Sequence, residues 1–444
     1  MLVNRVRSFK GGVHPKGHKE MSMDSCIQKL SPKGEISYLM SQHIGAPAQP
    51  CVAVGQRVLV GETIAKAPSF VSADICSSVS GTVKSIKPVP TSSGDDVTAI
   101  TIENDYEYEA VEGLGEACDY EKLTRDEIRE AIRSAGLVGM GGAGFPLSVK
   151  LAVKDDTKID HVIVNCAECE PYITCDYRLM IERTEKAVLG LKAVLKLFDN
   201  AVGVFAVENN KPLAIEALAK ATEGSERMQV QPLKTKYPQG GERLIIEAVT
   251  GRQINSKMLP ADAGCVVINL ATIMAAADAV CNRTPLITRV VTVTGDAINE
   301  PSNFEVPIGI CARELVEAAG GFKSDPEKII FGGPMMGPSI IDLDVPVTKT
   351  TSCILCLTHD EVKGLEATAC IRCGRCMNAC PENLMPLKLK DLADKRKYEE
   401  FEKLGGLECI GCGSCTYICP AKRRLSQSIT AAKREVLARK KAKK

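Results

Sequence analysis

The chain has 444 residues, of which 45% are hydrophobic and 25% charged, so it can bury a large core. A formal net charge of +1 argues against a nucleic-acid-binding protein. Twenty cysteines are many, and residues 1–12 lack the apolar run of a signal peptide, so we expect reduced thiols that bind metal or pack in a core. We expect no transmembrane segment, because the best apolar run, residues 261–280, contains Asp262, Asn269 and Asp278 and predicts a strand followed by a core helix.

Residues 1–120 form the first predicted unit. Within it, residues 44–88 alternate short strands with glycine turns, which looks like a half-barrel of the biotinyl or lipoyl type. Such domains carry a modified lysine at a hairpin tip, but the matching tip, residues 72–77, has no lysine, so we expect a structural module. Upstream, His14 and His18 could bind a metal, although an ordered or partner-contacting segment is the preferred interpretation.

Residues 121–285 alternate predicted helices and strands. A capping box, Thr124 with Glu127, and a stop at Gly136 predict the first helix. Strands that alternate with helices indicate a doubly wound, Rossmann-like α/β domain with ligand loops at the strand ends. The predicted strands lie within 161–173 and at 201–208 and 265–269, and a glycine turn opens a helix within 236–251.

A glycine-dense loop, LVGMGGAGFPLSVK at residues 137–150, follows the first helix of this domain. Glycines let backbone N–H groups approach a phosphate or a flat ring. Taken alone, this loop is as consistent with a tight turn as with a ligand site.

Residues 286–345 resemble a small β-grasp domain of the soluble-ligand-binding (SLBB) type, and we expect it to act as a spacer. Just beyond it, Cys353 and Cys356 form an isolated C-x2-C with His359 nearby. This group could be a third metal site, but a pair of buried packing thiols is the preferred interpretation.

The last predicted unit, residues 346–444, contains CIRCGRCMNACP at 370–381 and CIGCGSCTYICP at 409–420. Bacterial ferredoxins hold cubane clusters with this spacing, and the fourth cysteine of each run ligates the other run's cluster. Zinc is the alternative, but structural zinc sites use separated C-x2-C pairs. The segment between the runs is helix-prone, which indicates a helical ferredoxin domain. By the crossover rule, one [4Fe-4S] cluster takes Cys370, Cys373, Cys376 and Cys419, and the other takes Cys409, Cys412, Cys415 and Cys380.

The basic, helix-prone tail from residue 421 onward could lie near anionic lipid or on an acidic partner. A solvated, fraying terminus is the slightly preferred interpretation.

Four segments together resemble the flavin- and NADH-binding subunit of respiratory complex I. GMGGAGFPLSVK is similar to its GRGGAGFP-x-G-x-K, NCAECEP to its NADESEP, YPQGGE to its Y-x-x-G-E-E and CVVINLAT to its VVNNVET, in the same order. With the opening FKGGVHPKGHKE and the cysteine runs, nearly the whole chain resembles the RnfC family, the peripheral subunit of Rnf ferredoxin–NAD complexes.

The resemblance implies a non-covalently bound FMN and NAD(H) as substrate. Met140, Ala167 and Gly241 replace an arginine, an aspartate and a glutamate of the complex I subunit, which changes the polar contacts available to the flavin. By position, Gly139, Gly141, Gly142 and Gly144 would line the FMN, with Lys150 near its phosphate or ring; Asn165 and Glu168 would meet the ribityl chain or ring edge; Tyr237, Gly240 and Gly241 would form a second wall; Asn269 and Thr272 would bind the phosphate; and Phe145 and Glu242 would contact the nicotinamide nucleotide.

The resemblance further implies the NAD(H)-facing subunit of a membrane-bound Rnf complex, peripheral on the cytoplasmic face of the cell membrane. FMN and two [4Fe-4S] clusters would carry electrons between NAD(H) and the other subunits, membrane and ferredoxin-type, in a cycle coupled to Na+ or H+ translocation. One alternative is a soluble RnfC-like reductase, such as the cobalamin reductase of bacterial microcompartments. The order of segments argues against it, because here the cysteine runs follow the β-grasp segment. Another alternative is an electron-transfer scaffold that has lost its flavin.

Overall fold

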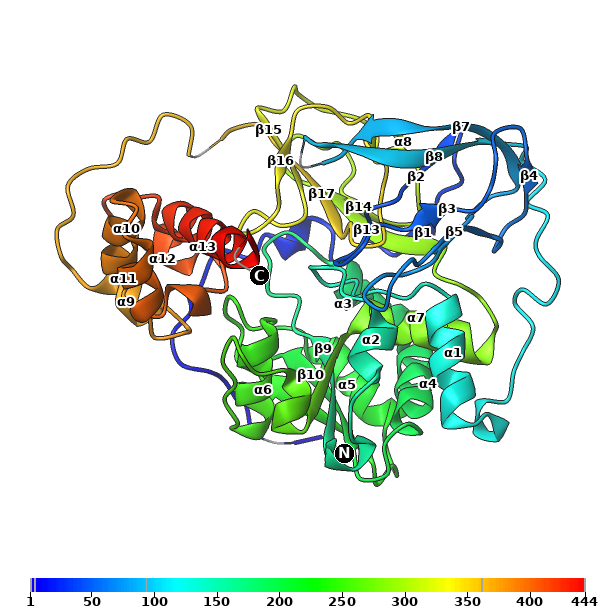
Figure 1. Ribbon diagram of the computed structural model, residues 1–444, viewed down its shortest axis with the longest axis horizontal. Coiled ribbons are helices and arrows are strands. Elements are labelled where there is room, and N and C mark those ends of the chain that lie inside the picture. The colour runs from blue at the N-terminus through cyan, green and yellow to red at the C-terminus, as the bar shows by residue number, and fades with distance from the viewer. Residues whose placement is uncertain (1, 4, 93, 361, 443–444) are drawn as a thin grey trace.

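The computed structural model describes residues 2–3, 5–92, 94–360 and 362–442. Figure 1 shows the strands of the N-terminal half-barrel and of the β-grasp region together at the top, with the α/β domain below them. A helical domain, α9 to α13, lies beside both. None of the helices in these described ranges is long and apolar enough to cross a bilayer.

The α/β domain is built on a 4-stranded parallel sheet with the order β11-β10-β9-β12. Alternate residues along β9 enter two separate cores, as the period of a strand requires. Val162 and Val164 pack among α4 and α7, whereas Ile163 packs with Ile245 and Ile246 of α6. The predicted doubly wound domain is therefore confirmed. The elements are β9 His161–Cys166, β10 Val202–Glu208, β11 Met228–Leu233, β12 Cys265–Asn269, α1 Arg125–Ser134, α2 Leu147–Leu151, α3 Cys175–Glu182, α4 Thr184–Leu195, α5 Pro212–Ala221, α6 Glu242–Thr250 and α7 Leu270–Cys281.

The half-barrel consists of two small sheets, ordered β2-β8-β7-β4 and β3-β5-β6. All residues of its tip, 72–77, are buried. The Lys349 ammonium donates to the carbonyls of Asp74 (2.6 Å) in this tip and of Gly136 (2.7 Å) after α1. The tip is thus clamped to the α/β domain, as expected of a structural module. The strands are β2 Ile36–Leu39, β3 Gln49–Pro50, β4 Arg57–Val58, β5 Thr63–Lys66, β6 Ile75–Cys76, β7 Gly81–Pro90 and β8 Asp96–Asn104.

The β-grasp sheet has the order β1-β14-β13-β17-β15-β16. It extends beyond residues 286–345, because β1 comes from the N-terminal segment and β17 follows residue 345. Cys353 and Cys356 lie on β17, both fully buried, and face different cores. The interpretation as packing thiols is confirmed. The elements are β1 Ile27–Lys29, β13 Thr288–Thr294, β14 Ser302–Pro307, α8 Ala312–Ala318, β15 Lys328–Phe331, β16 Ser339–Ile340 and β17 Cys353–Leu357.

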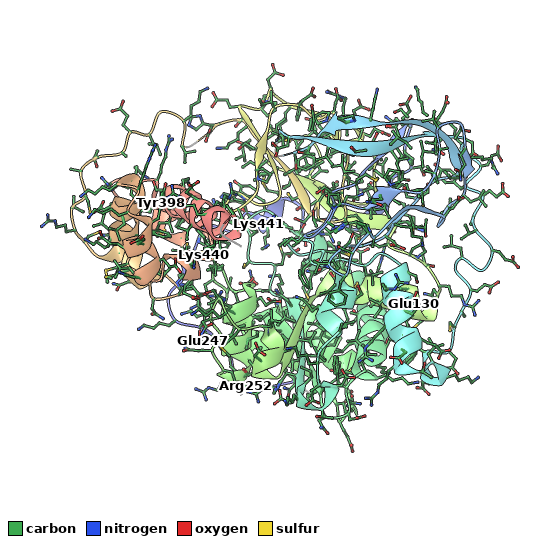
Figure 2. The ribbon with its side chains drawn as sticks, viewed as in Figure 1. Glu130, Glu247, Arg252, Tyr398, Lys440 and Lys441 are labelled. Atoms are coloured by element: carbon green, nitrogen blue, oxygen red, sulfur yellow. The ribbon has the colours of Figure 1, made fainter. Side chains whose placement is uncertain are left out.

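The helical domain ends in α13, which carries the basic tail. Its buried stripe, Leu425, Ile429, Ala432 and Val436, follows helical spacing and packs against α10 and α11. Near the end of α13, the Arg439 guanidinium lies 4.4 Å from the ring centroid of Tyr398, and Figure 2 shows Tyr398, Lys440 and Lys441 in this region. The expectation of a solvated, fraying tail is therefore wrong for most of this segment, because its apolar stripe completes the domain's core. The helices are α9 Arg375–Ala379, α10 Pro386–Asp394, α11 Tyr398–Lys403, α12 Ser414–Tyr417 and α13 Leu425–Ala442.

Candidate functional site

The ends of β9 and β12 meet where the strand order of the parallel sheet reverses. The chain runs from β9 to β10 and β11, then returns to β12 on the other side of β9. Asn165 and Asn269, the paired residues at these ends, are in register. Asn165 donates from Nδ2 to the Gly240 carbonyl (2.8 Å), and Asn269 caps α7 by accepting from the Thr272 N–H (3.3 Å). Ligands of open α/β sheets bind in the crevice at such a reversal.

The glycine loop closes over this crevice. Its ends are joined by a 2.9 Å bond from the Gly139 N–H to the Phe145 carbonyl. A Cβ on Gly141 would lie 2.8 Å from Asn269 Nδ2, whereas one on Gly142 would meet no atom of the described residues within 4 Å. Gly141 and Gly142 are both exposed. The loop therefore presents bare backbone beside the strand ends, which fits a flat ring or a phosphate.

Arg289 lies under the glycine loop and was not predicted from the sequence. This buried residue of β13 donates from Nη2 to the Met140 carbonyl (2.7 Å) and from Nε to the Thr351 carbonyl (2.7 Å). Its Nη1, like Asp176 Oδ1, is buried without a hydrogen-bond partner among the described residues. Orphaned buried polar atoms of this kind are typical of a site completed by a bound group. The only sequence signal was a lone arginine opening an apolar strand.

Lys150 and Glu242 form an ion pair at the edge of the crevice. The ammonium of Lys150, on α2, lies 2.6 Å from Glu242 Oε1, at the first residue of α6, and also donates to the Val267 carbonyl (2.9 Å). The structure thus brings together the predicted phosphate lysine and the predicted nicotinamide carboxylate. Both side chains stay partly exposed, so they are available to a ligand.

Glu168 and Thr272 hold backbone rather than facing the exposed loop. Glu168 Oε1 accepts from the Asp176 N–H (2.7 Å) at the start of α3, and burial raises the pKa of Glu168 to about 7. The buried Thr272 hydroxyl accepts from the Met140 N–H (2.8 Å) and donates to the Val138 carbonyl (3.3 Å). Direct contact of either side chain with a flavin stays a prediction.

The N-terminal segment is hydrogen-bonded to the loop between β9 and α3. The buried Lys19 ammonium donates to the carbonyls of Glu168 (2.9 Å), Glu170 (3.1 Å) and Ile173 (2.5 Å). His18 stacks on Tyr172, with 4.5 Å between ring centroids. The preferred interpretation of an ordered segment is confirmed.

The cysteines of the helical domain gather across the two runs. The inner cysteine set, Cys380, Cys409, Cys412 and Cys415, lines one cavity. The outer cysteine set is Cys370, Cys373, Cys376 and Cys419. Within it, burial raises the pKa of Cys376, and the nearby Cys419 thiol adds to that rise. Cys373 is exposed, whereas Cys412 and Cys415 are buried.

The spacing of these thiols does not suit a single zinc ion. Four sulfurs on one zinc would lie about 3.8 Å apart. Within the described ranges, the only group of three or more potential ligand atoms within 4.8 Å of one another is Asp160, His161 and Cys265. Four cysteines around a cavity, too far apart to share one ion, fit a larger cubane cluster.

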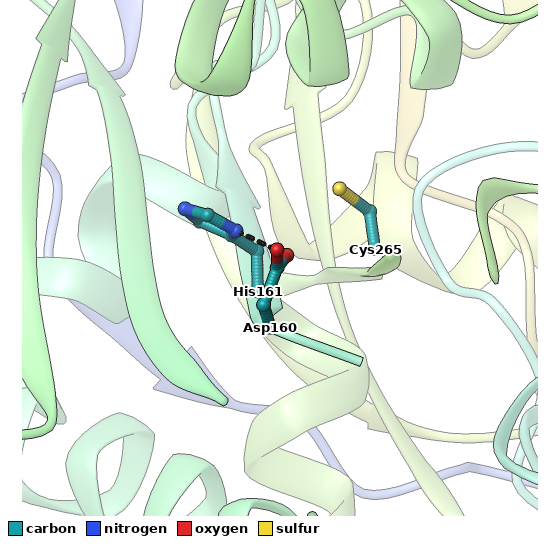
Figure 3. Close-up of side chains that lie close together, drawn as sticks. All are labelled: Asp160, His161 and Cys265. Atoms are coloured by element: carbon teal, nitrogen blue, oxygen red, sulfur yellow. Dashed lines mark hydrogen bonds and ion pairs between the residues drawn. The ribbon is translucent and has the colours of Figure 1, made fainter. Parts of the chain in front are cut away.

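The group Asp160, His161 and Cys265 is explained by an ion pair (Figure 3). Arg252 takes both carboxylate oxygens of Asp160, at 2.7 and 2.6 Å, and His161 Nδ1 lies 2.6 Å from Oδ1. Burial raises the pKa of Cys265 to about 11, so the thiol stays protonated. The group lies at the start of β9 and β12, at the opposite end of the sheet from the crevice.

Tyr237 joins the two candidate sites. Its side chain lies in one buried apolar cluster with Val13, Ala379 and Cys412, so the predicted second wall of the flavin site shares that cluster with a member of the inner cysteine set. The chain before Val13 continues this junction, because the Gly12 N–H donates to the Ala379 carbonyl (3.0 Å). Across the same boundary, Arg243 Nη1 lies 3.2 Å from Glu382 and 3.0 Å from Glu408.

Known protein families match the chain in the order of its regions. The RnfC barrel sandwich hybrid domain matches residues 7–107, the Nuo51 FMN-binding domain 132–278, the SLBB domain 290–339 and the 4Fe-4S dicluster domain 363–420. A relative from Clostridium ljungdahlii, a subunit of its proton-translocating ferredoxin:NAD(+) oxidoreductase complex, is 45% identical over 89% of this chain and 86% of its own length. The chain belongs to the RnfC family.

A second RnfC relative, from the Na(+)-translocating ferredoxin:NAD(+) oxidoreductase complex of Acetobacterium woodii, is 43% identical over 97% of both chains. A third, from the ion-translocating oxidoreductase complex of Rhodobacter capsulatus, is 39% identical over 86% of this chain and 74% of its own. The predicted RnfC architecture is thereby confirmed: half-barrel, FMN domain, SLBB domain and dicluster domain.

Proposed function

We propose that this chain is the NAD(H)-facing electron-transfer subunit of an Rnf complex, bridging NAD(H) and the other subunits. Its relatives are named as subunits of ferredoxin:NAD(+) oxidoreductase complexes, which supports this role. The observation that carries the proposal is the junction at Tyr237, a predicted wall residue of the flavin site that shares one buried apolar cluster with Cys412 of the inner cysteine set. A flavin site and a cluster site that share a wall can exchange electrons directly.

FMN, bound non-covalently, would supply the step between two-electron exchange with NAD(H) and one-electron exchange with the clusters. The exposed backbone at Gly141 and Gly142 offers a surface for the ring, and Asn165 and Asn269 orient the strand ends beside it. The Lys150 cation would neutralise the phosphate. The remaining proposed contacts are those predicted from the sequence: Gly139, Gly144, Glu168, Tyr237, Gly240, Gly241 and Thr272 for FMN, and Phe145 and Glu242 for the nicotinamide nucleotide.

The two cysteine sets would bind two [4Fe-4S] clusters at different positions along the path of electrons from the flavin. The inner set faces the α/β domain, since its member Cys412 lies in one buried apolar cluster with Tyr237 of that domain. The outer set is more accessible, with Cys373 exposed and Ile371 and Met377 exposed beside it. Electrons from the flavin would therefore reach the inner cluster first and leave through the outer one.

The complex would place this chain at the cytoplasmic face of the cell membrane, as a peripheral subunit beside membrane-bound and ferredoxin-type partners. The relatives are named for proton and for Na(+) translocation, and we propose that electron flow through this chain is coupled to one of these ions. Functionally, the chain would divide into the four predicted units, 1–120, 121–285, 286–345 and 346–444, with β17 joining the third.

An anaerobic reduction experiment tests the proposal. The full chain is reconstituted with iron, sulfide and FMN, and its visible spectrum is followed after NADH is added. We expect flavin bleaching followed by cluster reduction. Flavin that binds but stays oxidised would overturn the assignment of the NAD(H) site to this chain.

A further inference from the structure

The hydroxyl of Tyr237 has no hydrogen-bond partner within the part of the chain that the structure describes. The residue is 1% exposed, so the hydroxyl is buried. Buried polar groups are almost always hydrogen-bonded, so this hydroxyl calls for a partner. The neutral phenol is a donor as well as an acceptor.

The backbone of Tyr237 is held in place, and its side chain is buried. The N–H and the carbonyl of Tyr237 are both bonded to Val13, at 2.9 and 2.8 Å. Gly12 lies against the same carbonyl, since a Cβ there would come within 2.7 Å of the oxygen. The neighbouring Lys236 ammonium is fixed to the carbonyls of Phe9 and Gly11. The orphaned hydroxyl is therefore a fixed feature of the junction.

The surroundings of the ring hold few acceptors. Tyr237 packs in an apolar cluster with Val13, Ala379 and Cys412, flanked by further apolar side chains and Cys169. Cys169 Sγ already accepts from the Gly240 N–H (3.4 Å), and the nearby Glu170 carboxylate accepts from the Met335 N–H (3.1 Å). The sulfur of Cys412 is the member of the cluster that would become anionic when a [4Fe-4S] cluster binds.

We propose that the Tyr237 hydroxyl donates a hydrogen bond to the inner cluster, at the Cys412 sulfur or an adjacent sulfide, and so raises the cluster's reduction potential. Hydrogen bonds to the sulfurs stabilise the more negative, reduced cluster. The proposal rests on the proposed function, in which the inner cysteine set holds a cluster. Tyr237 would thereby raise the reduction potential of the cluster nearest the flavin. It would also give different potentials to two clusters that have nearly the same cysteine motif.

The test is the substitution Tyr237→Phe, which removes one oxygen and keeps the ring that packs at the junction. It is made in the full, reconstituted chain and also in a Cys373→Ala background, where only the inner cluster remains. Redox titration followed by EPR gives the midpoint potentials. We expect the inner cluster to become about tenfold harder to reduce at a given potential, a drop of about 59 mV for one electron. The outer cluster should keep its potential.

A second readout is the exchangeable proton itself. In the reduced inner cluster of the wild-type chain, pulsed EPR should detect a strongly coupled proton that exchanges with deuterium, and Tyr237→Phe should remove it. The matched control is Tyr38→Phe, a buried tyrosine of the half-barrel whose hydroxyl lies 2.7 Å from Ser78 Oγ, and it should change neither readout.

An inner-cluster potential that Tyr237→Phe leaves unchanged would overturn the inference. So would a shift confined to the flavin, which would mean that the hydroxyl faces the flavin instead. Failure of the proposed function looks different, because the wild-type chain itself would then bind no inner cluster.

Discussion

The inner cysteine set and the glycine-loop crevice differ in how far apart along the chain their residues lie. The inner set comes from two short runs, 370–381 and 409–420, within one small helical domain. The crevice combines α2, the ends of β9 and β12, the start of α6 and, beneath it, Arg289 of β13. A cluster site of this kind depends on local spacing, whereas the crevice depends on how separate regions pack.

This difference predicts which substitutions should disable each site. Loss of one cysteine should remove a cluster and leave the flavin in place. Loss of an arginine in the β-grasp sheet should weaken flavin binding and leave both clusters in place. The following substitutions test this contrast between the inner cysteine set and the glycine-loop crevice.

The largest expected effect is that of Cys412→Ala. This chain should lose the inner cluster and reduce its outer cluster with NADH at least about 100-fold more slowly, while its FMN content stays at the wild-type level. The matched variant Cys373→Ala should lose the outer cluster and still reduce the inner one. Iron analysis and stopped-flow spectroscopy measure both. Wild-type reduction of the outer cluster in Cys412→Ala would contradict the proposed order.

Gly141→Ala and Gly142→Ala should distinguish an added Cβ that meets the protein from one that would meet only a bound flavin. A Cβ at 141 meets Asn269, so this variant should lose about 2 kcal/mol of unfolding free energy as well as FMN affinity. Among the residues that the structure describes, none has an atom within 4 Å of a Cβ at 142, so the stability of the FMN-free chain should not change. FMN affinity should nevertheless fall about 30-fold, or about 2 kcal/mol. Wild-type FMN binding by Gly142→Ala would place the ring elsewhere.

Arg289→Met tests whether the β-grasp region supports flavin binding in the crevice. It removes the bonds to the Met140 and Thr351 carbonyls, so FMN affinity should fall about tenfold, equivalent to about 1.4 kcal/mol. Equilibrium flavin fluorescence measures the affinity, and iron content should not change. The control Arg313→Met alters an exposed ion pair of α8 and should leave FMN binding unaffected. Loss of iron in Arg289→Met would contradict the prediction that this substitution leaves both clusters in place.

The smallest expected effect is a pH dependence from Glu168. Its folded pKa of about 7 lies above the unfolded value of about 4.3, so the folded state binds the proton more tightly. This contribution to stability is fully present below the unfolded pKa and is lost as the pH rises through 7. Between pH 6 and 8 it should lower the unfolding free energy by about 1 kcal/mol.

Anaerobic chemical denaturation at several pH values measures this slope. Glu168→Gln should remove the Glu168 contribution, whereas Glu216→Gln, an exposed position on α5, should keep the wild-type slope. A Glu168→Gln slope equal to that of the wild type would show that the carboxyl is already ionised in the folded chain.

Much of the fold could be predicted from local patterns. The capping box of Thr124 and Glu127 forms as expected, because both partners lie within one helical turn. The strand at 265–269 and the helix after it follow from one apolar run that Asn269 divides by ending the strand and capping the helix. The tail was misjudged, since the burial of Ile429 and Val436 depends on helices that the tail sequence does not contain.

The sequence by itself determined the two cysteine runs of the dicluster domain, the strand-to-loop positions of the flavin motifs and the family. In each case the decisive spacing lies within a few residues, and the backbone between those residues has few conformations. Only the tertiary structure decided that Arg289 lies beneath Met140, that Lys150 meets Glu242 and that Tyr237 and Cys412 share one apolar cluster. These contacts join segments far apart in the chain, and their geometry follows from the packing of whole domains.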